Sequence, residues 1–203
     1  MFKLVIVDLI GILSSNENEY AMLKKVTNFK GTIQSLEGYI GEYYDKLLTG
    51  KITESVFWRK VIEKTGTRKK LENIKNQFFK SFDPIFDANL LKKARENFKF
   101  ALCSNFYKPW YEAIKKKYKI IFDYESLSSE AKLKKNNKLM YLNAMLNFNL
   151  KADECIVISD ESSDLSLAKE MGMNTLHIPG KTKEYKEADY SYHSFNDFLK
   201  ILI

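Results

Sequence analysis

The sequence has few of the residues that break or crosslink a chain. It contains three prolines, eight glycines and two cysteines among 203 residues. Disordered chains are typically rich in proline and poor in apolar residues, whereas 45% of this sequence is hydrophobic. The composition therefore indicates a globular protein, and the length allows one large domain or one domain with a smaller insertion.

Neither cysteine is placed for crosslinking or catalysis. Cys103 lies in the apolar run FALCSN and Cys155 in CIVIS, so both are predicted to be buried in strands. Two such thiols do not form a disulfide framework, which favours a reducing compartment. No histidine stands in a motif that would activate either thiol as a nucleophile.

The sequence also lacks a long hydrophobic run. No apolar stretch approaches the roughly 20 residues that a membrane-spanning helix needs. The N-terminus enters a predicted strand at once, without the pattern of a secretory signal. We therefore expect no membrane partner and a cytoplasmic location.

Positive charge is in excess, with a formal net charge of +7. The lysines are spread among acidic residues, as on an ordinary solvated surface, but the balance also favours anionic partners. No basic stretch interleaves with aromatic residues in a nucleic-acid-binding motif, so nucleic acid is not the expected partner. A small phosphorylated molecule fits the same charge.

The first predicted strand ends on an acidic residue. Residues 4–7, LVIV, are apolar without alternation, which is typical of a strand buried on both faces of a parallel sheet. Asp8 follows at once, and Gly11 indicates a tight turn. Open α/β sheets place their ligands at this end of their strands.

Residues 16–87 have helical periodicity and little strand pattern. Gly50 ends one predicted helix, Thr53 caps the next and Gly66 closes it. A further amphipathic helix over 68–81 has Leu71, Ile74 and Phe78 on its apolar face. This segment begins just after the first strand, so we expect it to lie over the strand ends as a helical lid.

Strands and helices alternate from about residue 88 onward. This order predicts an α/β fold with a doubly wound parallel sheet, formed by residues 1–15 and 88–203, with the all-helical segment 16–87 inserted. One of its helices, over 137–148, is expected to turn Leu139, Leu142, Met145 and Leu146 inward. The predicted strands after the first are 98–105, 120–125, 154–160, 174–178 and 189–192.

Three predicted strand ends carry polar side chains. Asp8 follows the first strand, Ser104 ends the next central strand and Asp160 ends the strand CIVIS. A lysine-rich stretch, 132–135, lies between the last two. A carboxylate can act as a nucleophile, a hydroxyl and an ammonium can hold an anion, and two carboxylates with a carbonyl can hold Mg²⁺.

Four segments in order resemble the motifs of haloacid dehalogenase-like (HAD) hydrolases. They are VIVDLIG with Asp8, ALCSN with Ser104, SLSSEAKLKK with Lys135, and ISDESSD with Asp160 and Asp164. The segment LLTGKITESVFWRKV is similar to the helical cap found in 2-haloacid dehalogenases and in the phosphatase domain of soluble epoxide hydrolases. The resemblance covers nearly the whole chain.

The resemblance implies a role for each matched residue. Asp8 is expected to be the nucleophile, with Ser104 and Lys135 as its catalytic partners and Asn105 binding substrate. Mg²⁺ is the implied cofactor. The resemblance also implies that Asp8, the Ile10 carbonyl and Asp160 ligate this ion, with Asp164 in support.

The first motif departs from the phosphatase pattern. Phosphatases of this superfamily have a second Asp two residues after the nucleophile, which serves as general acid and base; here that residue is Ile10, and Ile12 replaces the usual Thr. General acid–base catalysis is worth about 10²–10⁴-fold, so turnover of alkyl phosphates should be weakened. In the third motif, Lys132 replaces Gly and Asn136 replaces Pro.

Several interpretations remain open at this point. The favoured function is Mg²⁺-dependent hydrolysis of a small phosphorylated metabolite. The alternatives are a catalytically weak HAD-fold protein that binds or regulates, and a metal-independent dehalogenase-like hydrolase, whose relatives also lack the second Asp. Lys132, Lys134 or Lys138 could replace Lys135 in function, and Asp164 could simply cap a helix over 163–171. The substrate's identity and the oligomeric state leave no mark on the sequence.

Overall fold

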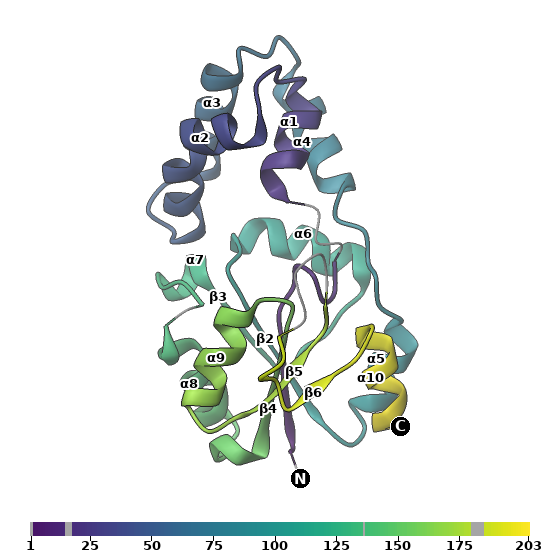
Figure 1. Cartoon of the computed structure of the whole chain (residues 1–203). Helices are drawn as coiled ribbons and strands as arrows, with labels where there is room; N and C mark the ends of the chain where they lie inside the picture. The colour runs from purple at the N-terminus through teal and green to yellow at the C-terminus, as the bar shows by residue number, and fades with distance from the viewer. Residues whose placement is uncertain (1, 15–17, 136, 180–184) are drawn as a thin grey trace.

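The computed structural model describes residues 2–14, 18–135, 137–179 and 185–203. Within these ranges the chain forms a parallel β-sheet with helices on both faces and a separate group of helices above one edge (Figure 1). The strands are β1 (Leu4–Val7), β2 (Lys99–Ser104), β3 (Tyr124–Leu127), β4 (Cys155–Ser159), β5 (Asn174–His177) and β6 (Tyr190–Ser191).

The helices confirm the predicted alternation around this sheet. Those in the helical insertion are α1 (Glu19–Thr27), α2 (Ile33–Leu48), α3 (Glu54–Thr65) and α4 (Leu71–Lys80). Those around the sheet are α5 (Ala88–Ala94), α6 (Lys108–Tyr118), α7 (Ser128–Ala131), α8 (Lys138–Asn147), α9 (Ser162–Glu170) and α10 (Phe195–Leu202), with a 3₁₀ turn at Ala152–Glu154.

The sheet has the strand order β3-β2-β1-β4-β5-β6, and all of its pairs are parallel. The sequence predicts a doubly wound parallel sheet, which this structure confirms. The direction of winding reverses beside β1, between β1 and β4, and such a reversal opens a crevice at the carboxyl ends of the strands.

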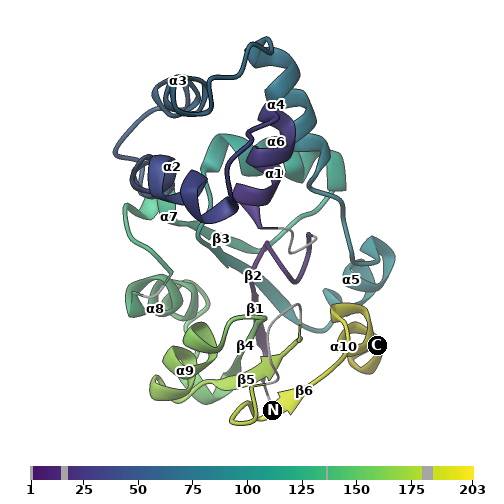
Figure 2. The same ribbon diagram turned by 45° about the horizontal axis from the view of Figure 1, so that its top comes forward.

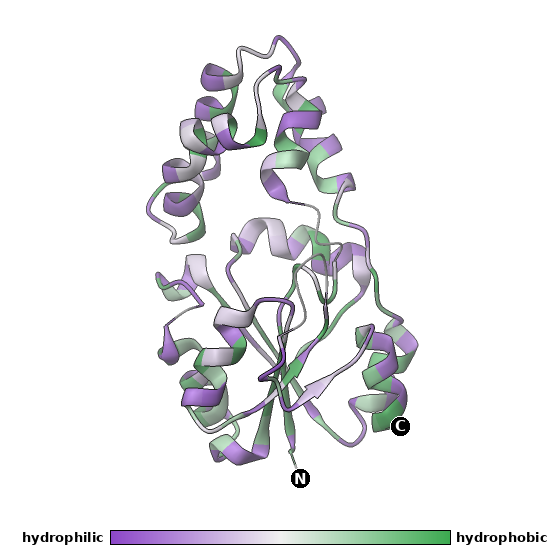
Figure 3. Cartoon of the chain, viewed as in Figure 1, coloured by the Kyte–Doolittle hydropathy of each residue, from purple (hydrophilic) through white to green (hydrophobic). Residues whose placement is uncertain are grey.

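Strand β1 supplies both halves of the core because successive side chains point to opposite faces. Val5 and Val7 join the cluster that includes side chains of α5, α6 and α10, whereas Leu4 and Ile6 pack with α8 and α9. Figure 3 shows hydrophobic residues along the strands in the centre of the sheet. The absence of alternation in LVIV is explained by this two-sided burial.

Helices α1 to α4, which we call the cap, lie above the carboxyl ends of the strands (Figures 1 and 2). Thr32 and Thr53 cap α2 and α3 with their side chains, and Gly66 ends α3 in the left-handed conformation. The domain limits at 15/16 and 87/88 stay a prediction, and the first of them lies outside the described residues.

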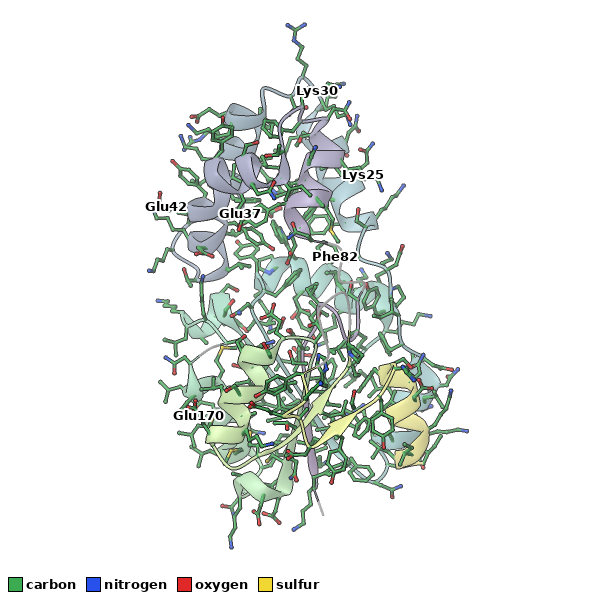
Figure 4. The ribbon with its side chains drawn as sticks, in the orientation of Figure 1. Lys25, Lys30, Glu37, Glu42, Phe82 and Glu170 are labelled. Atoms are coloured by element: carbon green, nitrogen blue, oxygen red, sulfur yellow. The ribbon has the colours of Figure 1, made fainter. Side chains whose placement is uncertain are left out.

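Aromatic side chains join the cap to the sheet domain. Trp110 of α6 contacts Tyr44, Phe57 and Phe78 of the cap at ring-centroid distances of 6.4, 5.7 and 5.2 Å. Phe82, labelled at the junction in Figure 4, packs against Phe78 at 5.2 Å. Fully buried aromatic contacts of this kind hold two units in one orientation.

The predicted inward face of the helix over 137–148 is only partly correct, since Met145 packs against the buried cluster as expected but two of the leucines do not. Leu139 and Leu146 are 47% and 65% exposed, whereas Met140, Tyr141 and Ala144 are buried. Tyr141 and Ala144 pack onto the face of the sheet in the cluster that contains Leu4 and Ile6. The helix is apolar on more than one side, and the small Ala144 selects the side that can approach the sheet.

Two further details differ from the prediction. The strand expected at 120–125 begins only at Tyr124, because Phe100 and Asp123 exchange hydrogen bonds ahead of the ladder, at 2.9 Å each. Leu71, expected to be buried, is 39% exposed because it is the first residue of α4, while Ile74 and Phe78 are buried. No helix in the described residues is long and apolar enough to cross a membrane.

Candidate active site

The predicted site residues meet where the winding of the sheet reverses. Strands β2 and β4 flank β1, so their carboxyl ends lie on either side of Asp8. Ser104 is the last residue of β2, and Asp160 directly follows β4. The register pairs Val7 with Ile158, and the Asp8 N–H donates to the Ile158 carbonyl at 3.3 Å.

Asp8 is buried and both of its carboxylate oxygens are engaged. Oδ1 accepts hydrogen bonds from the Leu9 N–H and from the Ser104 hydroxyl, each at 2.7 Å. Oδ2 accepts a hydrogen bond from the Lys135 ammonium. These donors fix the orientation of the carboxylate.

Lys135 is the lysine of the third motif that reaches Asp8. Its ammonium also contacts Asp164 Oδ2 at 2.5 Å, and the backbone N–H of Lys135 donates to Asn105 Oδ1 at 2.5 Å. Burial alone would lower the pKa of Lys135, but the charges of Asp8 and Asp164 outweigh burial and hold that pKa well above its usual value.

The other lysines of this stretch lie elsewhere. Lys134 pairs with Asp45 of the cap, and Lys138 pairs with Glu170. Lys132 is exposed and ends α7 with φ of 55°, a left-handed conformation that favours glycine. The family pattern has Gly at this position, so the substitution keeps the backbone geometry. Asn136, the second departure in this motif, lies outside the described residues.

The interpretation of Asp164 as a helix cap is wrong. Helix α9 begins at Ser162 with Glu161 at the N-cap, and Asp164 lies within its first turn. The Asp164 side chain is buried, where it accepts a hydrogen bond from the Ser159 hydroxyl at 2.9 Å as well as contacting Lys135. Its position therefore orients the lysine that holds Asp8.

The carboxylate of Asp160 lies directly against Gly11. A Cβ atom added to Gly11 would stand 2.4 Å from Cγ of Asp160, and the backbone there has φ of +82°. Only glycine combines this conformation with so close an approach. Gly11 thus lets the second carboxylate rest on the loop that carries Asp8 and Ile10.

Replacing Gly11 with alanine is therefore expected to displace Asp160. Left-handed strain costs about 1–2 kcal/mol, and the clash with the carboxylate adds to it. Gly66→Ala is a matched control, because Gly66 also has positive φ, of 62°, yet meets no atom within 4 Å. Thermal unfolding of both variants measures the difference, and equal losses would show that the contact with Asp160 is unimportant.

The position two residues after Asp8 has no acid or base. Ile10 is partly buried and packs against the larger hydrophobic cluster. Its backbone carbonyl is the oxygen that the family resemblance implicates in metal binding. The departure seen in the sequence therefore leaves an apolar side chain at the edge of a polar site.

The donor set suits a hard divalent cation. Mg²⁺ is commonly bound by one or two carboxylates and completes its shell with water and substrate phosphate oxygens. Asp8, Asp160 and the Ile10 carbonyl offer only oxygen. No group of three His, Cys, Asp or Glu side chains in the described part of the chain could hold a metal ion.

Glu19, the first residue of α1, was not predicted from the sequence. Its Oε1 accepts a hydrogen bond from the Tyr44 hydroxyl at 3.2 Å. Burial raises the pKa of Glu19, and the charges of Asp8 and Asp160 raise it further, against the opposing effects of its backbone N–H and Tyr44. An acidic residue after an Asn cap is common at a helix start, so the sequence offers no signal for this contact.

The remaining titratable candidates are structural. Burial raises the pKa of the Cys103 and Cys155 thiols to about 12 in each case, and both are free. His177 is buried and accepts a hydrogen bond from the Tyr185 N–H at 3.1 Å, while His193 is exposed. None of these groups is placed as a nucleophile.

A doubly wound sheet with a helical cap and an aspartate after β1 is the architecture of HAD proteins. The profile of the haloacid dehalogenase-like hydrolase family matches residues 11–178. The chain belongs to this family, whose members are hydrolases. The match begins three residues after Asp8. No curated protein sequence matches the chain.

Solved structures of this family share the fold. The HAD family enzyme BT-2542 from Bacteroides thetaiotaomicron is 20% identical, with a TM-score of 0.74 over 90% of this chain and 96% of that one. The structure of its complex with magnesium and inorganic phosphate is 21% identical in sequence, with a TM-score of 0.72 over 92% of this chain and 98% of that one. The L-2-haloacid dehalogenase PA0810 is 13% identical, with a TM-score of 0.75 over 100% of both chains.

Proposed function

We propose that this protein is a Mg²⁺-dependent hydrolase that acts on a small phosphorylated metabolite. The observation that carries the proposal is the placement of the Asp160 carboxylate against the loop of Asp8, which gives two acidic side chains at the switch point of the sheet. A structurally similar family enzyme, BT-2542, binds magnesium and inorganic phosphate. The positive net charge of the chain is consistent with an anionic substrate.

In this proposal Asp8 attacks phosphorus. Its carboxylate oxygen forms a bond to phosphorus while the bond to the leaving oxygen breaks, which yields an aspartyl phosphate that water then hydrolyses. The Leu9 N–H, Ser104 and Lys135 orient the nucleophile by the contacts described above. Ser104 and Lys135 also offer donors to the phosphoryl oxygens, and the Asn105 amide lies beside this pair.

Mg²⁺ would be held by Asp8, Asp160 and the Ile10 carbonyl, and it would offset the negative charge on the phosphoryl group. Asp164 acts indirectly, through its contact with the Lys135 ammonium. Without Asp164 the ammonium would be free to shift away from Asp8.

Two other functions remain as alternatives. Ile10 favours a metal-independent dehalogenase-like reaction, because displacement of halide needs no acid for the leaving group. It equally favours a catalytically weak HAD-fold protein that binds or regulates. Asp160 argues against the first alternative, since its carboxylate adds negative charge where a metal-free site has no need of it.

A panel assay separates the three functions. Aryl and alkyl phosphates and 2-haloacids would be supplied with Mg²⁺ or with EDTA, and phosphate or halide release would be followed. We expect Mg²⁺-dependent phosphate release, fastest with aryl phosphates, whose leaving groups need no proton. Halide release in EDTA would support the dehalogenase, and no release at high enzyme concentration would support the binding protein.

Replacing Ile10 with aspartate is expected to increase the turnover of alkyl phosphates, by about 10-fold or more, because general acid–base catalysis is worth roughly 10²–10⁴-fold. The backbone carbonyl at this position is unchanged by the substitution. Steady-state phosphate release measures the effect, with Ile10→Asn as the isosteric control that lacks a transferable proton. Equal rates in the two variants would contradict the prediction.

A further inference from the structure

The excess positive charge of the chain is concentrated at one end of the cap. Residues 24–33 and 64–71, which we call the cap tip, contain no acidic residue. Seven of the 33 basic residues lie here, and the other 26 are matched by the 26 acidic residues of the remaining chain, so the net charge of +7 belongs to the cap tip. Figure 4 shows Lys30 projecting from the end of the cap that faces away from the sheet.

Helix stability explains only part of this charge. Three of the seven basic residues stand in the last turns of α1 and α3, where a cation offsets the partial negative charge of a helix C-terminus. The other four lie beyond these turns, and they are Lys30, Arg68, Lys69 and Lys70. Cations gathered in two short loops repel one another, and an anionic ligand would remove that cost.

The two loops of the cap tip are tied together by Lys69. Its ammonium donates to the Val26 carbonyl at 2.7 Å and to Asn28 Oδ1 at 3.2 Å. An ammonium has three donors, and these contacts account for two of them. The backbone N–H of Lys69 donates to Thr67 Oγ1 at 3.3 Å, which orders the loop between α3 and α4. The cations of the cap tip are therefore carried on a preformed framework.

An open hollow of about 550 Å³ lies between these loops. Residues 27–31 line one side of it and residues 65–69 line the other. Sites for small molecules commonly have volumes of about 300–1,000 Å³. Lys30, Arg68 and Lys69 are among the lining residues, and neither lining segment contains an acid. The hollow therefore has the size and the charge to hold a small molecule with several negative charges.

Phe29 adds an aromatic wall to the hollow. The half-buried ring also lines a second hollow of about 400 Å³ on the side of α1. A Cβ atom added to Gly31 would stand 2.5 Å from a carbon of this ring, so the ring rests against the backbone of its own loop. Tyr39 packs against it edge-on, at 6.2 Å between centroids. An aromatic ring held in this way among cations can stack with a nucleobase.

We propose that the cap tip is a binding site for a nucleoside polyphosphate, with the phosphates between Lys30, Arg68 and Lys69 and the base against Phe29. Several cations match the several charges of a polyphosphate chain, and the ring accounts for the base. An acidic protein or an anionic membrane would meet the same charge but has no need of the hollow. The site is separate from the Asp8 cluster, so this inference does not depend on the proposed function.

The test is calorimetric titration of the wild-type protein with ATP, tripolyphosphate and adenosine. EDTA is included so that Mg²⁺-dependent turnover does not contribute heat. ATP is expected to bind at least about 10-fold more tightly than either fragment, because only ATP uses both the cations and the ring. Its affinity should fall as NaCl is added, since salt screens charges at an exposed site.

Two variants assign this binding to the cap tip. Lys30→Gln combined with Arg68→Gln should raise the Kd for ATP by about 10-fold or more. The matched control is Lys92→Gln combined with Lys93→Gln, at exposed residues of α5, which changes the net charge equally and should alter the Kd by less than about 2-fold. Phe29→Leu should raise the Kd for ATP by about 5-fold or more and leave that for tripolyphosphate unchanged. Circular dichroism verifies that each variant is folded.

Four results would overturn the inference. The first is no binding of ATP to the wild type at concentrations up to about 1 mM. The second is an equal Kd in the cap-tip and control double variants, which would assign binding to the active site or to net charge alone. The third is tripolyphosphate binding as tightly as ATP. The fourth is an oligothymidylate, or vesicles containing phosphatidylserine, binding at least about 10-fold more tightly than ATP, which would make the cap tip a surface for nucleic acid or membrane instead.

Discussion

Asp8→Asn is expected to abolish Mg²⁺-dependent phosphate release, with a loss on the order of 10⁴-fold or more in kcat. An asparagine amide is a far poorer nucleophile than a carboxylate. It is also a neutral and weaker ligand for a cation and leaves Lys135 with Asp164 as its only charged partner in the cluster described above. The loss should be the same for aryl and alkyl phosphates, because both need the nucleophile.

The control for this variant is Asp83→Asn, an equivalent substitution at an exposed residue paired with Lys117. Initial rates of phosphate release under saturating substrate measure the effect, and gel filtration with circular dichroism verifies folding. Residual activity within about 10-fold of wild type would show that Asp8 is not the nucleophile.

Lys135→Met is expected to cause the largest loss of stability, about 3–5 kcal/mol in the free energy of unfolding. The ammonium is buried between Asp8 and Asp164, which would be left as buried like charges without the cation that separates them. Methionine fills much of the volume of the lysine stem, so the loss reflects charge and hydrogen bonding rather than a cavity. Urea denaturation followed by circular dichroism measures it.

The pH dependence of this effect follows from the raised pKa of Lys135. A raised pKa means that the contribution of the ammonium is fully present below its ordinary pKa of 10.5 and is lost only as the pH rises through the still higher value of the folded state. The difference between wild type and Lys135→Met should therefore be constant from about pH 6 to 9.

Two further variants make the stability test specific. Lys138→Met removes an exposed lysine that pairs with Glu170, and it should change stability by no more than about 0.5 kcal/mol. Adding Asp8→Asn to Lys135→Met should recover part of the loss, because one unpaired charge is removed. Additive losses in the double variant would contradict the pairing.

The sequence was sufficient to predict Asp8, Ser104 and Asp160 as neighbours. Each stands at the end of an apolar strand, and parallel strands bring these ends to the same edge of the sheet. The order of elements likewise predicts the doubly wound sheet, because alternating strands and helices can pack into few other architectures. These predictions depend on local patterns that are read along the chain.

Lys135 and Glu19 required the structure. The sequence offers four lysines in this stretch with no feature that separates them: Lys132, Lys134, Lys135 and Lys138. Only the path of the chain after α7 shows that Lys135 is the one that reaches Asp8. Glu19 looks like an ordinary first-turn acid, and its environment comes from Tyr44, distant in the sequence. The face of α8 was only partly predicted: Met145 packs against the buried cluster as expected, but Tyr141 and Ala144 are buried there while Leu139 and Leu146 are exposed.

The two segments that connect the cap to the sheet domain are themselves linked. Ser14 forms a β-bridge with Pro84, and the Ile85 N–H donates to the Leu13 carbonyl at 3.1 Å. The outgoing and returning chains are therefore joined to each other at the base of the cap. The contacts of Trp110 with Tyr44, Phe57 and Phe78 form a second, separate attachment. Displacing the cap from the strand ends would therefore require these aromatic contacts to break while the two connecting segments stay paired.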